Sequence, residues 1–143
     1  DGVSCICQER LGSVRPVRTA PYPGFPTDAQ AVLMAALLRS RGATVFEETI
    51  FENRYRHVDE LGRMGADIRV AGRVAVVTGT EILRGAPVRC TDLRGGAALC
   101  VAALAAEGET SIAEISHIDR GYECIEKDLR TLGADIVRTE LTI

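Results

Sequence analysis

The chain has 143 residues, of which 46% are hydrophobic and 26% are charged, and its formal net charge at pH 7 is −3. These values are typical of one globular unit with its own core, and the net acidity argues against a nucleic-acid partner. The longest apolar run, at about 97–106, is far shorter than the roughly 20 residues that a membrane span needs, so we expect no membrane partner. Aromatic residues make up only 4% and there is no Trp, so we expect a core of Ala, Val, Leu and Ile.

The cysteines and histidines predict neither a disulfide framework nor a metal site. Their odd number and irregular spacing disfavour disulfides. The five cysteines are Cys5, Cys7, Cys90, Cys100 and Cys124. The only histidines, His57 and His117, complete no ligand pattern and read as ordinary surface or junction residues. We therefore predict no metal and no cofactor, and we interpret the cysteines as small buried hydrophobic residues in a reducing, cytoplasmic environment.

The first elements along the chain are two predicted strands, Val3–Gln8 and Val14–Thr19, joined around Gly12. They resemble the tail of a repeating unit whose beginning is absent. The N-terminal residue, Asp1, is not a natural start, which fits a processed or excised piece of a longer chain. We expect the chain to be an incomplete domain.

A first set of elements follows, beginning with an Ala- and Leu-rich helix that has few charges and is therefore expected to be buried. Gly42 stands at the stop position of this helix, and a turn at 69–73 joins the last two strands. The predicted elements are a helix over Thr27–Arg41, a strand over Thr44–Ile50, a helix over His57–Met64 and strands over Asp67–Val70 and Arg73–Thr78.

A second set repeats the same order. Residues 42–48 correspond to residues 108–114, and residues 61–68 correspond to residues 129–136. The predicted elements are a helix over Leu93–Glu107, a strand over Thr110–Ile115, a helix over Tyr122–Leu132 and a strand over Asp135–Arg138. Such a unit cannot bury its helices alone and must associate with copies of itself. We predict an α+β fold of two repeats, at about 20–87 and 88–143, with a possible homo-oligomer covering exposed helices.

The segment before the first helix is a candidate for chemistry. Three prolines and a glycine within residues 21–26 fix an irregular backbone that leads directly into the helix, where Asp28 lies in the first turn. One interpretation is a helix-capping carboxylate, favoured by the helix dipole. The other is a carboxylate on a rigid platform that takes a proton from a substrate hydroxyl.

Three arginines recur at equivalent junctions. Arg54 and Arg120 each follow a strand and a polar residue, and Arg94 lies in the first helical turn at the position equivalent to Asp28. A cation there is disfavoured by the helix dipole, which suggests a purpose such as gripping a phosphate or carboxylate. The alternative is that each arginine pairs with a nearby acid such as Glu52, Asp92 or Asp119.

Four segments, at 22–30, 51–54, 91–94 and 117–123, resemble those of the UDP-N-acetylglucosamine 1-carboxyvinyltransferases, a family of enolpyruvyl transferases. The first segment carries the Pro-Gly-Phe-Pro-Thr-Asp motif, which the sister 3-phosphoshikimate enzymes lack. The similarity runs from about Val17 to Asp135. It implies an inside-out α/β barrel built from βαβαββ units, with three units in each of two domains.

The resemblance also implies an activity and its residues. The family transfers enolpyruvyl from phosphoenolpyruvate to the 3-hydroxyl of UDP-N-acetylglucosamine, the first committed step of peptidoglycan synthesis. Asp28 corresponds to the carboxylate beside that hydroxyl, and Ile50 to a position where the backbone contacts the UDP-sugar. Arg94 and Arg120 match arginines that contact phosphoenolpyruvate, and Arg54 matches a further arginine of the site.

The sequence departs from the family in one respect. The reactive cysteine of the family lies in a Gly-Gly-Cys context in the other domain, and no cysteine here has that context; Lys127 is the only lysine. We therefore expect this chain to be inactive alone. Two alternatives stay open: a non-catalytic module that binds UDP-sugar or regulates, and the sister 3-phosphoshikimate 1-carboxyvinyltransferase.

Overall fold

The structure is a computed structural model that describes residues 2, 4, 6 and 9–140. The helices are α1 (Thr27–Ala36), α2 (His57–Arg63), α3 (Leu93–Leu104), α4 (Ser116–Asp119) and α5 (Ile125–Thr131). The strands are β1 (Val17–Arg18), β2 (Ala43–Glu47), β3 (Asp67–Ala71), β4 (Val74–Thr78), β5 (Leu83–Arg84), β6 (Pro87–Arg89), β7 (Ala106–Glu107) and β8 (Ser111–Ala113). This mixture confirms the predicted α+β class.

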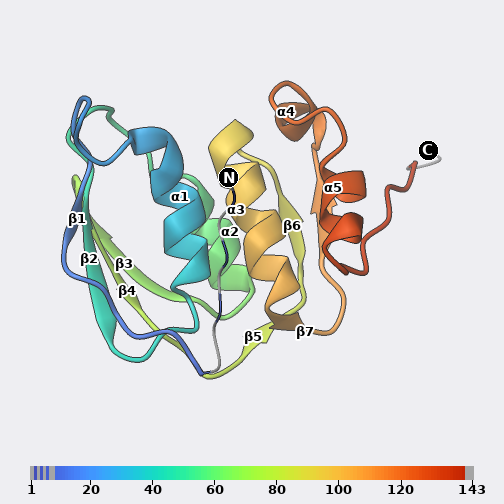
Figure 1. The fold of residues 1–143 in the computed structure, drawn as a ribbon, viewed down its shortest axis with the longest axis horizontal. Helices are drawn as coiled ribbons and strands as arrows, with labels where there is room; N and C mark the ends of the chain where they lie inside the picture. Colours follow the sequence, from blue (N-terminus) through green and yellow to red (C-terminus); the bar gives the residue numbers. More distant parts are fainter. Residues whose placement is uncertain (1, 3, 5, 7–8, 141–143) are drawn as a thin grey trace.

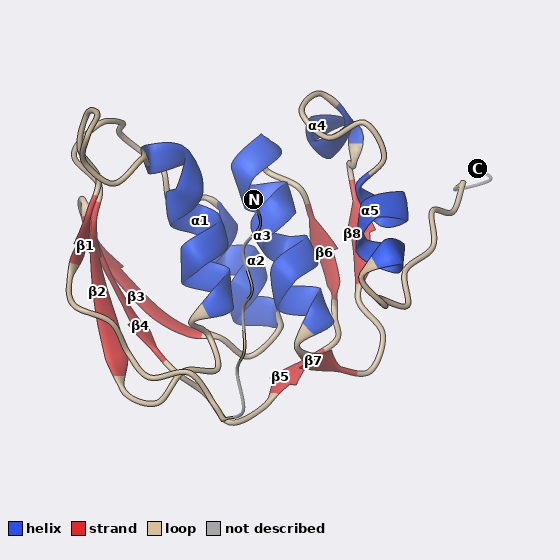
Figure 2. Cartoon of the chain, viewed as in Figure 1, coloured by secondary structure: helices blue, strands red, loops and turns tan. Residues whose placement is uncertain are grey.

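Three groups of strands surround a layer of helices. The largest sheet has the order β1-β2-β4-β3, in which β1 runs parallel to β2 and β4 runs antiparallel to both of its neighbours. Two parallel pairs, β5–β7 and β6–β8, complete the strands. Figures 1 and 2 show α1, α2 and α3 lying between the large sheet and the β6–β8 pair. The strands lie outside α1, α2 and α3, as the resemblance to an inside-out barrel implies, whereas α5 lies on the outer side of the β6–β8 pair (Figure 2).

The core lies where α1 and α3 run side by side over the large sheet. One cluster of fully buried side chains contains Met34 of α1, Leu38 just beyond the end of α1, Ala98 and Leu99 of α3 and Phe46 of β2. The small alanine side chains of both helices let their axes come close, so their first turns also lie near each other. Phe46 is the only fully buried aromatic residue in the part of the chain that the structure describes, as the composition predicted.

Several elements are shorter than predicted, for local reasons. The first helix ends at Ala36 instead of Arg41, because tight bonds such as Ser40 N–H to the Leu37 oxygen, at 2.9 Å, replace helical ones. The next strand ends at Glu47 instead of Ile50, because the following side chain accepts bonds from the backbone and turns the chain. The helix of the second copy ends at Leu104, since the next residues form β7.

Gly42 and Gly108 adopt the left-handed conformation expected of them, with φ of 89° and 86°, which other side chains disfavour. Their predicted place at the helix ends is wrong, because α1 ends at Ala36 and α3 at Leu104, and the glycines lie in the segments that lead to β2 and β8. Gly72 adopts φ 59° in the turn between β3 and β4, which confirms the predicted hairpin.

Two of the predicted strands differ in the structure. No strand forms over Asp135–Arg138, because this segment turns toward α4 and α5, where Arg138 binds Asp119 at 2.7 Å and Glu126 at 3.2 Å. The strand expected over Val14–Thr19 is reduced to β1. It pairs with β2 and so belongs to the large sheet, although it lies before residue 20. The strand predicted over Val3–Gln8 falls largely outside the described residues.

Candidate active site

The proline-rich segment forms a closed loop that leads into α1. Within it the Ala20 amide donates to the Phe25 oxygen at 3.0 Å, and the Gly24 amide donates to the Pro21 oxygen at 2.8 Å. A side chain at position 24 would come within 2.5 Å of Ala20, so the loop needs glycine there. Asp28 follows in the first turn of α1, with 58% of its side chain exposed.

Two of the predicted arginines meet the Asp28 carboxylate. Arg54 donates from Nη2 to Oδ1 at 2.8 Å, and Arg94 donates from Nη2 to Oδ2 at 2.9 Å. The hydrogen bond from Arg94 is the main cause that holds the pKa of Asp28 below its usual value. Partial burial opposes this effect, and the charges of Arg94 and Arg54 add to it. The acid that pairs with Arg54 and Arg94 is Asp28, and not Glu52, Asp92 or Asp119 as the pairing alternative expected; a role in gripping an anion stays a prediction.

Asp28 and Arg94 meet because the two helices that carry them lie side by side. Asp28 and Arg94 occupy equivalent first-turn positions of α1 and α3, and the two helices lie side by side. The hydrogen bond with Asp28 is the main cause that raises the pKa of the Arg94 guanidinium, and the neighbouring Tyr122 adds to this effect. The guanidinium of Arg54 stacks over the Phe51 ring at 5.0 Å from its centroid, which fixes the side chain on the loop after β2.

The other two predicted residues lie outside this cluster of bonds. Arg120 ends α4 and is exposed, and its Nη2 is 2.8 Å from Nδ1 of His117. Ile50 lies on the loop after β2, and its amide donates to Glu48 at 2.8 Å. A ligand that contacts the Ile50 backbone would therefore have to use the carbonyl oxygen.

Sequence reasoning missed Glu48, which is 1% exposed beside the cluster and accepts five hydrogen bonds. The burial of Glu48 could have been predicted from the alternation of side chains along its strand. Thr44, Phe46 and Glu48 alternate toward the interior, so the strand pattern places an acid among buried side chains. Thr27 and Gln30, which donate to it, lie on either side of Asp28 in α1.

One histidine differs from expectation. His57 is 1% exposed instead of lying at the surface, and burial lowers its pKa to about 4, so it is neutral at pH 7. The two cysteines of the second copy's core, Cys90 and Cys100, are buried and free, and burial raises their pKa values to about 12 and about 11. Cys90 and Cys100 therefore confirm the interpretation of the cysteines as buried thiols, whereas Cys124 is only half-buried. Cys5 and Cys7 lie outside the described residues.

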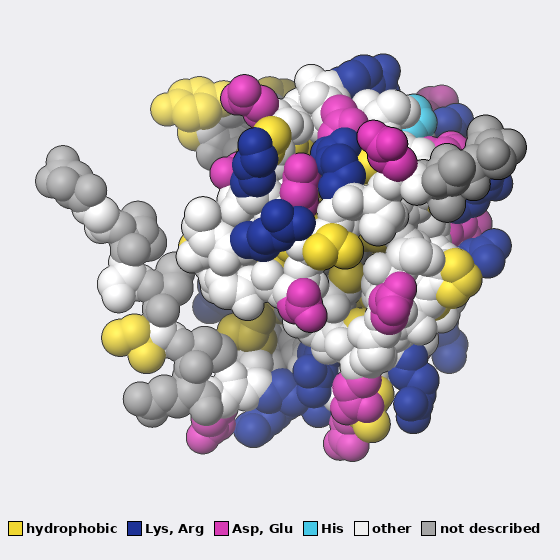
Figure 3. Space-filling model, turned by 90° about the vertical axis from the view of Figure 1, so that its right-hand side faces the viewer, with side chains coloured by type: hydrophobic (Ala, Val, Ile, Leu, Met, Phe, Trp, Pro, Cys, Tyr) yellow, Lys and Arg dark blue, Asp and Glu magenta, His cyan; other side chains and the backbone are white. Residues whose placement is uncertain are grey.

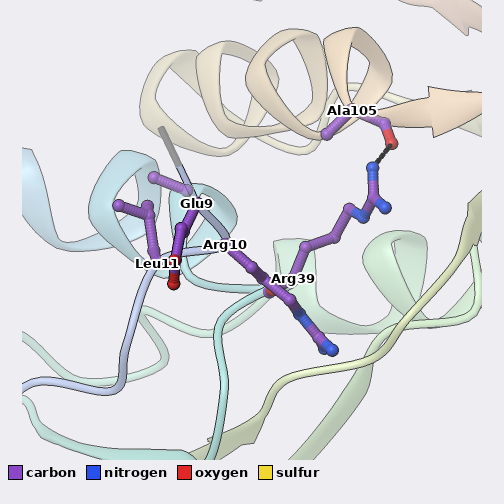
Figure 4. A pocket seen from close by; sticks show the side chains of 6 residues that line it. Glu9, Arg10, Leu11, Arg39 and Ala105 are labelled. Atoms are coloured by element: carbon purple, nitrogen blue, oxygen red, sulfur yellow. Dashed lines mark hydrogen bonds between the residues drawn. The ribbon is translucent and has the colours of Figure 1, made fainter. Parts of the chain in front are cut away.

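A hollow of about 410 Å³ lies at the opposite end of α1 and α3 (Figure 4). Its arginines are used structurally, since Arg39 donates to the Ala105 oxygen at 3.3 Å and Arg10 donates to the Thr80 oxygen at 2.6 Å. Acidic and basic side chains are interspersed over the α4–α5 side of the molecule, with hydrophobic ones scattered among them (Figure 3). Neither feature extends the Asp28 cluster.

The described residues hold no group of three or more His, Cys, Asp or Glu side chains placed to bind a metal ion. No helix in the same part of the chain is long and apolar enough to cross a membrane.

The solved structures that resemble this fold are enolpyruvyl transferases. The enolpyruvyl transferase NikO from Streptomyces tendae is 35% identical with a TM-score of 0.79, over 90% of this chain and 30% of that one. EPSP synthase from Acinetobacter baumannii is 26% identical with a TM-score of 0.63, over 80% of this chain and 27% of that one. The chain belongs to the EPSP synthase (3-phosphoshikimate 1-carboxyvinyltransferase) family, whose model matches residues 5–129.

Within this family, the similar curated proteins carry the name UDP-N-acetylglucosamine 1-carboxyvinyltransferase. One from Zymomonas mobilis is 61% identical over 84% of this chain and 28% of the relative. Another, from Clostridium acetobutylicum, is 54% identical over 98% of this chain and 34% of the relative. The predicted resemblance is confirmed, and the chain spans about a third of the length of the curated relatives that it matches.

Proposed function

We propose that this chain forms part of the site at which enolpyruvyl passes from phosphoenolpyruvate to the 3-hydroxyl of UDP-N-acetylglucosamine, in peptidoglycan synthesis. The observation that carries the proposal is the contact of Asp28 with Arg54 and Arg94 at the paired starts of α1 and α3. The names of relatives that are 50–61% identical supply the substrate class.

The proposed site residues include one proton acceptor, Asp28, and three arginines that bind anionic groups of the substrate. Asp28 takes the proton of the sugar hydroxyl while that oxygen bonds to the substituted enol carbon, and the electrons of the carbon–carbon double bond take up a proton from solvent at the methylene carbon. Phosphate later leaves with the electrons of its carbon–oxygen bond, while the new methyl group gives up a proton and the double bond forms again. Arg94, Arg54 and Arg120 bind the phosphate and carboxylate of phosphoenolpyruvate, for which guanidinium groups are suited. Ile50 presents its carbonyl oxygen to the UDP-sugar.

The unliganded cluster gives phosphoenolpyruvate a way to activate Asp28. A carboxylate held by two arginines is a weak base, as its lowered pKa indicates. An incoming phosphate and carboxylate compete for the same guanidinium groups, and each arginine that turns to the ligand leaves Asp28 more basic. Binding of phosphoenolpyruvate would thereby prepare Asp28 to accept the hydroxyl proton of the UDP-sugar.

The chain alone is expected not to turn over. About two thirds of the length of the relatives has no counterpart here. By the family resemblance we place the reactive cysteine in that part, because no cysteine of this chain stands in a Gly-Gly-Cys context. The buried free thiols support a reducing compartment, and we place the reaction in the cytoplasm.

The test is a chimera in which this chain replaces the matching third of the Zymomonas mobilis relative. We expect phosphate release from phosphoenolpyruvate with UDP-N-acetylglucosamine, and a loss of about 10²–10⁴-fold in kcat for Asp28→Asn. Asp67→Asn is the matched control, because Asp67 is a half-exposed acid on β3 with only a 4.0 Å contact to Arg69. A chimera that is folded by circular dichroism but releases no phosphate would contradict the proposal.

The sister activity is the second candidate, because the family model and two of the similar structures carry the name EPSP synthase. It predicts phosphate release with shikimate 3-phosphate in place of the UDP-sugar. The third candidate, a non-catalytic UDP-sugar module, predicts calorimetric binding by the 143-residue chain that Asp28→Asn abolishes, together with an inactive chimera.

A further inference from the structure

Glu48 is a buried carboxylate held by hydrogen bonds instead of by a counter-ion. The residue is 1% exposed, and within the described residues no lysine or arginine forms an ion pair with it. A buried charge without compensation is costly, so the groups around it must supply the missing solvation. Five donors do so, and they come from three separate segments of the chain.

One oxygen of the carboxylate holds the loop that follows β2. Oε1 accepts the amides of Ile50 at 2.8 Å and Phe51 at 3.0 Å, and also the hydroxyl of Thr19 at 3.0 Å. This loop leads three residues later to Arg54, one of the two partners of Asp28.

The other oxygen holds the first turn of α1. Oε2 accepts the hydroxyl of Thr27 at 2.9 Å and the side-chain amide of Gln30 at 3.0 Å. These two residues lie on either side of Asp28 in the sequence. The N-cap of α1 is Pro26, which forms no side-chain cap, so Glu48 contributes the side-chain anchor that this helix start otherwise lacks.

All five groups are donors, and only an ionised carboxylate accepts from all of them. Burial by itself would raise the pKa of Glu48, but the hydrogen bonds from Phe51, Ile50, Thr27 and Thr19 outweigh it and hold the pKa below its usual value. The side chain is therefore charged at neutral pH, and each of its bonds is charge-assisted.

The second copy provides an internal comparison. Glu114 occupies the position equivalent to Glu48, yet its side chain is 49% exposed and pairs with Arg89 at 2.9 Å. Its backbone has φ 59°, which turns the side chain away from the interior. The buried network therefore does not follow from the repeat itself, and it is present only in the copy that carries Asp28.

We propose that Glu48 is a positioning residue that holds the first turn of α1, with Asp28, against the loop that carries Ile50 and Arg54. The inference rests on the proposed function for the meaning of these residues, but the positioning itself is a property of the free chain. If Glu48 loosens, Arg54 loses its fixed geometry relative to Asp28, while Arg94, which comes from α3, remains in place.

The test follows the titration of the Asp28 carboxyl by NMR in the 143-residue chain. In Glu48→Asp the shorter side chain still reaches the nearby amides of the loop, as an aspartate at a turn does, but it falls short of Thr27 and Gln30. We expect the titration midpoint of Asp28 to rise toward that of an ordinary aspartate, because the bond from Arg54 weakens.

Glu48→Gln keeps the length of the side chain and should move the midpoint less. Its amide group can donate to the Thr27 hydroxyl and to the Gln30 side-chain oxygen, a buried atom that has no partner in this structure. Glu47→Asp and Glu114→Asp are the matched controls, since both side chains lie in surface ion pairs, and neither should move the midpoint.

An Asp28 midpoint that is the same in folded Glu48→Asp as in the two controls would overturn the proposal. Where Glu48→Asp does not fold by circular dichroism, Thr27→Val breaks the same link from the α1 side, and its midpoint decides the question in the same way. In the active chimera, Glu48→Asp should lower kcat about 10–100-fold with a partial return in Glu48→Gln. The titration needs no substrate, so an inactive chimera would remove the proposed function and leave the positioning role standing.

Discussion

The two copies of the repeat each run from a strand through a first helix to a further strand and a later helix, but they differ in how well they are buried. In the first copy, α2 lies against α3 and β6, and His57, Val58 and Leu61 are buried. The corresponding helix of the second copy, α5, has no buried residue. The comparison shows that burial depends on the neighbours that each copy finds, and that the repeated pattern does not fix every element, since no strand forms over Asp135–Arg138.

The copies also differ where the strand passes into the first helix. The register aligns them, because Val17 lies opposite Phe46 and Val88 lies opposite Ile112, the residue equivalent to Phe46. The junction that follows spans residues 19–26 in the first copy and only 90–92 in the second. The added length is the proline-rich loop, so the first copy carries an extra rigid segment directly before Asp28.

The largest expected effect sharpens the difference in burial. Leu61 is fully buried in α2, and the equivalent Leu129 in α5 is only partly buried. Leu61→Ala should lower the free energy of unfolding by about 2–5 kcal/mol, because it removes packed atoms and leaves a cavity. Leu129→Ala should cost about 1 kcal/mol or less, because much of its surface already meets water.

Urea unfolding of both variants, followed by circular dichroism, measures these free energies. Equal losses at the two positions would show that α5 is as well packed as α2, and the contrast between the copies would then be wrong.

A smaller effect concerns the two helix starts. Asp92 caps α3 by accepting the Gly95 amide at 2.8 Å, whereas Pro26 precedes α1 without a side-chain cap. Asp92→Ala should lower the free energy of unfolding by about 1 kcal/mol, and Asp92→Asn should restore most of the loss. Thermal unfolding of the three proteins checks this. A loss that is the same for Asn and Ala would mean that the capping oxygen contributes nothing.

The sequence was sufficient for the features that depend on local patterns. Gly42 and Gly108 adopt the left-handed conformation expected of them, although each lies several residues beyond its helix, and the 66-residue correspondence placed Asp28 and Arg94 at equivalent positions. Their meeting could not be read from the repeat alone, since it requires α1 and α3 to lie side by side.

Features that depend on tertiary neighbours were missed or wrong. The segment Asp135–Arg138 has strand-like residues but turns toward α4 and α5, where Arg138 finds two acids. His57 has the polarity of a surface residue but is covered once α2 lies against α3. The burial of Glu48 could have been read from the alternation of its strand, but its hydrogen-bond partners could not, because they come from segments as far as 29 residues away.

The smallest expected effect tests whether the two copies are linked through the Asp28–Arg94 pair. The folded-state pKa of Asp28 lies below the usual value of 3.8, so its contribution to stability is present above that value and is lost as pH falls through the lowered pKa. Because 58% of the Asp28 side chain is exposed, solvent screens the pair, and Asp28→Asn should cost at most about 1 kcal/mol at pH 7. The wild type and the variant should become equally stable in acid below the lowered pKa, and 1 M salt should shrink their difference at pH 7. A double-mutant cycle with Arg94→Gln, measured by urea unfolding, isolates the interaction between the copies. A coupling energy of zero at low salt would mean that the Asp28–Arg94 ion pair does not stabilise the contact between the two copies. The packing of α1 against α3 would then be what holds the copies together at this end.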